Sequence, residues 1–433
     1  MKKRIAIVLA LAIVFALAAC GGSTAEKPQP VHAPEEDDRI YYLNCNPAVD
    51  DALQELAAAY TAETGIPVKV LTPPSGTYDD TLAAEMSKAK APTIFNIRHQ
   101  DDLIRWDGHT LDLTGSAITA QLTTDAFNLY SETGALKAIG NSYESFGIIV
   151  NTQLLEQAGY TLADITDFES LKTVCEDITA RSAALGFCAF TSSGLDRSSS
   201  ARFSQQLASL PLHYEGITTC VPAITGEKLD LYRNVWDLYL ANSSADPLTL
   251  PISTAEDAAA MFREGKAVFW QNGTWEYDPL IQAGMTDDQL AMIPIYCGAE
   301  GEENTALCSG TQYHWAVNAK VSSTARQASL DFLEWLVTDP EATTIYSRQA
   351  GAVPFQNAPP SPNKFILDGI ELLAAGKAPV SWAFQYAPNT EFWSATVATG
   401  LAAYAADPTD DTWQQVVGAF VDGWAYEYTM VNN

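Results

Sequence analysis

The chain alternates between short apolar strands and amphipathic helices over the first part of its folded body, and this alternation limits the fold more than any other feature. Residues 39–44 (RIYYLN) are typical of a strand, and residues 66–71 and 93–97 form two further strand-like runs. Between these runs, apolar side chains recur at helical spacing in residues 47–64 and 78–86. The pattern predicts an α/β domain with a mostly parallel sheet, whose ligands lie beyond the carboxyl ends of the strands.

A second folded unit is expected to start at the strand-forming run SFGIIVN, residues 145–151. The body from residue 39 onward is too long for one ordinary core, so length also favours two domains. After this run the sequence predicts four helices, then three strands, and a helical end from residue 323. The expected helices span 167–184, 198–209, 226–241 and 254–264, and the expected strands span 267–271, 290–296 and 313–318.

The N-terminal segment has the layout of a secretion signal. Three basic residues at positions 2–4 precede an apolar run that is shorter than the roughly 20 residues of a membrane-spanning helix, and small residues follow. The tetrapeptide LAAC resembles the bacterial lipobox, which implies that residues 1–19 are removed and that Cys20 carries a diacylglyceryl group. Two acyl chains anchor a protein stably. A plain secreted protein with an incidental cysteine is the alternative. Residues 20–38 are expected to be a flexible tether.

The charge and the histidines exclude two classes of function. With 53 acidic and 24 basic residues, the chain has a formal net charge of −29, which would repel nucleic acid and anionic membranes. We interpret most of this acid as a solvated surface of a soluble body outside the cell. The five histidines neither cluster nor stand at ligand spacing, so we expect no metal site.

Six cysteines remain besides Cys20, an even number in an oxidising compartment, and this favours disulfides. Many pairings are possible. The local choices are Cys175 with Cys188 and Cys297 with Cys308, which leaves Cys45 with Cys220 by subtraction.

Seven segments, in this order, resemble the family 1 extracellular solute-binding proteins of ABC importers, the group that contains maltose-binding protein. Each is weak alone, but their order behind a lipobox is specific. They are YYLNCN, AYTAETGIPV, APTIFNI, SFGIIVNTQLLEQAGY, FWQNGTW, EWLVTDPEA followed by YSRQAGAVP, and TEFWSATVATGLAAYA.

The resemblance implies a two-lobed fold of the periplasmic-binding-protein type (type II), in which crossover segments form a hinge and the ligand binds between the lobes. Transferring the crossovers places residues 39–146 plus 287–322 in one α/β lobe and residues 147–286 plus 323–433 in the other. It also implies a monomer that captures a carbohydrate, without chemistry of its own, and passes it to the permease of an ABC importer.

A sugar presents apolar faces and a rim of hydroxyls, so its binder needs flat aromatic rings and carboxylates or amides. By resemblance, Trp275 and Trp393 stack on the ligand, and Glu144 binds hydroxyls. Trp270 faces either the core or the cleft, and Asn272 either binds ligand or shapes its turn. Each of these residues also has a structural interpretation: core packing, a turn or a solvated acid.

Further polar residues follow the first and third expected strands, at the carboxyl ends where ligands bind. These are Asn44 and Asn46, and Arg98, Gln100 and Asp101. Tyr313 is a weaker candidate, as are Trp382 and Arg348.

Two other functions remain open. The same scaffold could bind a polyamine, a metal such as iron, or a peptide, although iron would need a tyrosine cluster and Tyr41 and Tyr42 should point to opposite faces of their strand. A secreted glycoside hydrolase would need two carboxylates about 5 to 10 Å apart, and no sequence feature marks such a pair.

Overall fold

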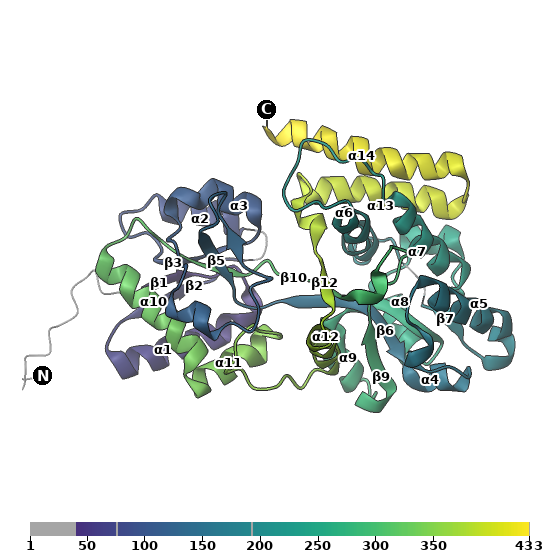
Figure 1. The fold of residues 1–433 in the computed structure, drawn as a ribbon, viewed down its shortest axis with the longest axis horizontal. Helices are drawn as coiled ribbons and strands as arrows, with labels where there is room; N and C mark the ends of the chain where they lie inside the picture. Colours follow the sequence, from purple (N-terminus) through teal and green to yellow (C-terminus); the bar gives the residue numbers. More distant parts are fainter. Residues whose placement is uncertain (1–39, 75–76, 192–193, 433) are drawn as a thin grey trace, which may run out of the picture.

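Two lobes lie side by side in the computed structural model, which describes residues 40–74, 77–191 and 194–432 (Figure 1). The expected signal peptide, Cys20 and the tether lie outside these residues. Within the described part, no helix combines the length and the apolar character that crossing a membrane requires.

The first lobe is built on a six-stranded sheet with the order β2-β1-β3-β11-β5-β4. The expected parallel arrangement is confirmed for its first three strands, because β1 pairs in parallel with both β2 and β3, whereas β11 pairs antiparallel with β3 and β5. The strands are β1 (Ile40–Leu43), β2 (Val68–Leu71), β3 (Ile94–Ile97), β4 (Leu129–Tyr130), β5 (Leu136–Gly140) and β11 (His314–Val317).

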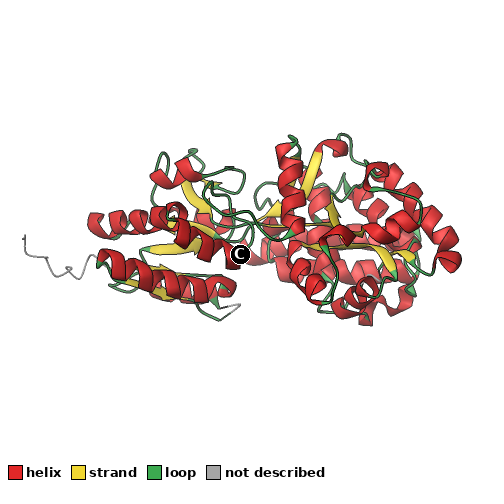
Figure 2. Ribbon diagram, turned by 90° about the horizontal axis from the view of Figure 1, so that it is seen from below, coloured by secondary structure: helices red, strands yellow, loops and turns green. Residues whose placement is uncertain are grey.

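Five α-helices belong to this lobe: α1 (Asp50–Thr64), α2 (Tyr78–Met86), α3 (Gln100–Trp106), α10 (Ser323–Thr338) and α11 (Pro340–Ala350), as the described residues define them. Helix α1 buries Leu53, Leu56 and Tyr60. It ends at Gly65, which adopts a φ of 76° that glycine tolerates without strain. Figure 2 shows the strands of both lobes lying between helices.

The second lobe contains a mixed sheet with the order β12-β10-β6-β8-β7, and β9 pairs with β6 beside this path. The long strand β6 lies at its centre and pairs antiparallel with β8, β9 and β10. The strands are β6 (Glu144–Asn151), β7 (Cys188–Phe190), β8 (Ala267–Gly273), β9 (Leu290–Ile293), β10 (Thr305–Gly310) and β12 (Ala378–Ser381).

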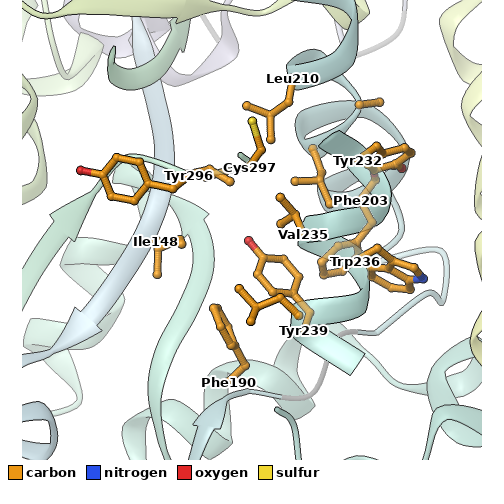
Figure 3. Packing of buried hydrophobic residues seen from close by; sticks show 14 of the residues in the cluster. Ile148, Phe190, Phe203, Leu210, Tyr232, Val235, Trp236, Tyr239, Tyr296 and Cys297 are labelled. Atoms are coloured by element: carbon orange, nitrogen blue, oxygen red, sulfur yellow. The ribbon is translucent and has the colours of Figure 1, made fainter. Parts of the chain in front are cut away.

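Aromatic side chains from helix α7 fill the core of this lobe. Figure 3 shows Trp236 and Tyr239 facing Phe203 and Phe190, with ring centroids 5.0 Å and 4.5 Å apart respectively. The α-helices around the core are α4 (Thr152–Gln157), α5 (Phe168–Leu185), α6 (Ser209–Tyr214), α7 (Leu229–Ala241), α8 (Ala255–Arg263), α9 (Tyr277–Gln282), α12 (Lys364–Ala374), α13 (Thr390–Ala406) and α14 (Asp410–Asn432).

Three segments of the described chain connect the lobes: β5 to β6, β10 to β11, and α11 to α12. The first and third are joined by a bridge between Tyr143 and Ala352, in which the Tyr143 amide donates to the Ala352 carbonyl at 2.8 Å. These segments form the hinge.

The sheets and cores divide the chain at different residues from the expected boundaries. The residues that form β9 and β10 were expected in the first lobe, but both strands pair with β6 of the second. Helices α10 and α11 were expected in the second lobe, but their side chains Phe332, Leu336 and Tyr346 pack in the first core with Leu53. The sheet that a strand joins depends on partners far away in the sequence, so local patterns could not assign it.

None of the three expected disulfides is formed, and the six described cysteines are free thiols. Cys175 lies in the core of the second lobe, whereas the Cys188 thiol donates to the Phe190 carbonyl at 2.9 Å. Cys297 and Cys308 are buried in the same core as Cys175. Spacing alone therefore did not identify bonded pairs.

Candidate functional site

A cleft separates the lobes where α3 of the first lobe faces the C-terminal end of α14 (Figure 1). It has a volume of about 980 Å³, and we call it the outer cleft. Side chains from both lobes line it, among them Arg98 and Asp101 on one side and Gln205, Phe384 and Glu391 on the other. A molecule held there would contact both lobes at once.

A smaller pocket of about 170 Å³ adjoins the outer cleft beside the crossing segments, and we call it the inner pocket. Gln205, Gln312 and Phe384 line both cavities, so the two are continuous. The other residues that line the inner pocket are Glu144, Gln206, Trp275, Tyr313 and Trp382. It thus combines four aromatic rings with one carboxylate and several amides.

Two tryptophans of the inner pocket are each held against a glycine. The Trp275 ring lies over Gly273, where a Cβ atom would be 2.2 Å from the ring, and Trp275 remains 38% exposed. A Cβ atom at Gly310 would lie 2.6 Å from Trp382, whose indole also stacks on Phe146 at 5.7 Å and donates to the Cys308 carbonyl at 3.1 Å. Only glycine permits such close approach, so each ring can pack directly on the backbone of its glycine.

The polar side of the inner pocket is formed by Glu144, Tyr313 and Gln206. Glu144 begins β6, and burial raises the pKa of its carboxyl group. Burial also raises the pKa of the Tyr313 hydroxyl, and the charge of Glu144 adds to this effect. Gln206 lies in a π-helical turn, η5 (Arg202–Leu207), and its buried Oε1 has no hydrogen-bond partner within the described chain. These groups can accept or donate hydrogen bonds to a ligand's hydroxyls.

Ion pairs organise the first-lobe side of the outer cleft at the end of β3. Arg98 pairs with Asp79 at 2.6 Å and with the buried Asp102 at 3.5 Å. Asp101 lies beside them, and burial raises the pKa of its carboxyl group, although the nearby Cys220 of the second lobe partly offsets this rise. Gln100 donates to the Tyr130 carbonyl at 3.0 Å and lines a separate recess.

Three expected ligand amides instead stabilise turns. Asn44 donates to the Asn46 carbonyl at 2.7 Å, and Asn46 caps the 3₁₀ turn η1 (Pro47–Val49) by accepting from the Ala48 amide at 3.0 Å. Asn272 donates to Glu276 at 2.9 Å and accepts from the Gly273 amide. Asn, which commonly caps helices and turns, uses its side chain locally in all three places.

Two expected ligand tryptophans are core residues. Trp270 is buried against Phe262, with centroids 5.6 Å apart. Trp393 is completely buried between α13 and α14, where it donates to the Phe420 carbonyl at 2.9 Å and packs edge-on against Trp424. The prediction that Trp393 stacks on a ligand does not agree with this placement.

Sequence reasoning missed Gln205, Gln206, Gln312 and Phe384, which line the inner pocket. Gln205 and Gln206 lie in the π-helical turn η5, Gln312 lies between β10 and β11, and Phe384 lies in the short 3₁₀ helix η10 (Ala383–Tyr386). No regular periodicity marks a binding residue in such segments. Arg348 lines a different groove, on the hinge side of α11 and α12.

Solved structures of solute-binding proteins share this architecture. The apo form of RafE from Streptococcus pneumoniae superimposes with a TM-score of 0.69 at 17% identity, covering 91% of this chain and 99% of that one. A family 1 extracellular solute-binding protein from Bifidobacterium longum subsp. infantis gives 0.68 at 16% identity, covering 90% and 99%. RafE in complex with raffinose gives 0.58 at 16% identity, with coverage of 90% and 99%.

A comparison with curated protein sequences finds no significant match. The family model described as bacterial extracellular solute-binding protein, however, matches residues 55–365, which is most of the chain and spans both lobes and all three crossing segments. The chain therefore belongs to the bacterial extracellular solute-binding protein family.

Proposed function

We propose that this protein captures a carbohydrate between its lobes and delivers it to the permease of an ABC importer. One observation carries the proposal: the inner pocket places the open face of Trp275 beside a carboxylate and several amides. Flat rings match the C–H faces of a sugar, and the polar groups match its hydroxyls. RafE, which was solved with raffinose, and GacH of Streptomyces glaucescens, solved with acarbose, have the same fold and support this ligand class.

Capture would occur by closure. A ligand that contacts Trp275 on one lobe and Arg98 or Asp101 on the other favours the conformation in which both contacts form. The permease would recognise that closed conformation. We propose that the protein does no chemistry itself, in keeping with the solute-binding family to which it belongs.

The site residues of the proposal are Glu144, Trp275 and Tyr313 in the inner pocket and Arg98 and Asp101 in the outer cleft. We further propose that the mature protein is a monomer held on the outer face of the cytoplasmic membrane by the lipid on Cys20. The tether of residues 20–38 would keep the receptor close to its permease.

A thermal-shift screen of residues 21–433 against mono- to tetrasaccharides, with polyamines and short peptides as parallel arms, tests the proposal. A ligand at 100 times its dissociation constant stabilises by about 2.7 kcal/mol, which a thermal scan detects. Stabilisation by a carbohydrate supports the proposal, and stabilisation by a polyamine or a peptide alone would replace it. Release of smaller sugars from the bound oligosaccharide would show that the protein is an enzyme.

A further inference from the structure

The apolar face of helix α14 continues beyond the part of the lobe that covers it. Trp413, Val416, Phe420 and Trp424 recur at helical spacing and are all buried against the second lobe. The same spacing continues to Tyr428 and Val431, but Val431 is 56% exposed. An apolar side chain on the buried face of a helix thus reaches the solvent at the end of α14.

This end of the helix lies at the mouth of the outer cleft, opposite α3. Figure 1 shows the last turns of α14 extending from the second lobe toward the first. Val431 and Tyr428 line the same cavity as Ile104 of α3, which is 58% exposed. In the same helix Leu103 is buried in the first lobe, whereas the apolar side chain of Ile104 points to the cavity. Two exposed apolar side chains therefore face one cavity from opposite lobes.

The polar surroundings of these residues are complementary. On the first-lobe rim, Arg105 is exposed and its nearest carboxylate, Asp102, is 3.7 Å away. On the second-lobe rim, Glu391 is exposed and lines the same cavity. Asp101 on the first-lobe rim and Cys220 on the second-lobe rim line the same cavity. Closure from this position would bring opposite charges and two apolar groups together.

We propose that Val431 packs against Ile104 when the lobes close, so that the end of α14 acts as a latch that holds the cleft shut over its ligand. This inference rests on the proposed function in one respect, namely that binding of a ligand drives the lobes to close. Its contact lies at the rim, away from the inner pocket, so it governs release and leaves ligand recognition to other residues.

Disulfide trapping tests the contact without any ligand. In a Cys220→Ser background, the pair Ile104→Cys with Val431→Cys is oxidised with copper phenanthroline and the linked peptides are identified by mass spectrometry. The control pair is Ile104→Cys with Tyr426→Cys, because Tyr426 is equally exposed but lies on another face of α14. We expect the first pair to cross-link several-fold faster, since a disulfide forms only between closely spaced Cβ atoms. Equal rates would overturn the latch.

Release kinetics test its role. Ile104→Ser and Val431→Ser should each speed ligand dissociation about three- to tenfold, as the loss of a buried apolar contact predicts, and the double variant should show less than the product of the two effects. Ile252→Ser is the matched control, because Ile252 is 77% exposed and lines no part of the cleft. If carbohydrate binds but both variants release it at the wild-type rate, the latch is wrong and the capture function stands. If no carbohydrate binds, the capture function fails, and the cross-linking rates still decide the latch.

Discussion

Single side chains determine what the inner pocket can bind, and Trp275 offers it the most open aromatic surface. Trp275→Ala should weaken carbohydrate binding about tenfold, because a stacked ring contributes about 0.5 to 1.5 kcal/mol beyond the area that it buries. Trp275→Phe keeps a flat ring and should retain most of the affinity. Isothermal titration calorimetry measures both, and an unchanged dissociation constant in Trp275→Ala would contradict the stacking role.

Trp393→Ala provides the contrast. Removing this buried ring should lower the free energy of unfolding by about 3 to 5 kcal/mol while the folded protein binds ligand as before. Urea denaturation checks the first effect and calorimetry the second. The two tryptophans lie in segments that both resemble ligand-binding segments of the family, so the sequence could predict an aromatic at each place. It could not predict that α14 would cover Trp393, because the helix that buries it begins 17 residues later in the chain.

Ionisation of the Glu144 carboxyl group should lower the free energy of unfolding. Its folded-state pKa is raised by burial above the ordinary value of 4.5, so the charged form destabilises the ligand-free protein. This penalty is absent below the unfolded pKa and is fully present once the pH exceeds the folded pKa. Glu144→Gln should therefore raise the melting temperature at pH 7 but not at pH 4, as calorimetric scans at both values would measure.

The same substitution should weaken ligand binding, because a hydrogen bond to a charged acceptor is worth about 1.5 to 3 kcal/mol, or roughly 10- to 100-fold in affinity. Asp164→Asn is a matched control and should leave ligand binding unchanged. Asp164 is exposed in the second lobe, and hydrogen bonds from Thr161 lower the pKa of its carboxyl group. A variant of Glu144 that loses stability at pH 7 would contradict the burial argument.

Among the helices and strands, α5 depends on a carboxylate from a distant turn. The buried Glu302 accepts from the amides of Phe168 at 2.7 Å, Cys297 at 2.6 Å and Gly298 at 2.8 Å. Glu302→Ala would leave these donors unpaired and should lower the free energy of unfolding by about 2 to 4 kcal/mol. Chemical denaturation measures this loss. Glu303→Ala, at the exposed neighbouring position, should change stability little, and equal effects of the two variants would refute the capping role.

Helices and strands with regular periodicity could be predicted from the sequence, as β1, α1, β3 and β6 illustrate. Strand β10 could not, because its sequence (TALCSG) is short and contains small polar residues, and only its pairing with β6 and β12 makes it a strand. The same reason explains the misplaced lobe boundaries. Pairing across more than 150 residues decides which lobe receives β10, and no local pattern records it.

For the whole molecule, the equilibrium between open and closed lobes depends on the cleft on one side of the hinge and on a groove on the other. Behind the crossing segments, a groove of about 890 Å³ is lined by Thr344 and Arg348 of α11 in the first lobe and by Ile366 and Ile370 of α12 in the second. Figure 1 shows these two helices on the side of the molecule away from the cleft mouth. A rotation that closes the cleft about the hinge must move α11 and α12 apart, so the groove is narrowest when the cleft is open.

A larger side chain in this groove should therefore favour the closed lobes. Ile370→Trp adds bulk at a half-exposed position that faces α11, so it should make the ligand-free protein more compact in solution X-ray scattering. Because apparent affinity rises with the population of the binding-competent state, carbohydrate should bind several-fold more tightly. Ile252→Trp, which adds the same ring far from the groove, should change neither quantity. The two substitutions should act in opposite directions on the same equilibrium between open and closed lobes. Val431→Ser should shift it toward the open lobes, and Ile370→Trp should shift it back in the double variant. If the double variant still releases its ligand as fast as Val431→Ser, the two sides of the hinge are not coupled through closure.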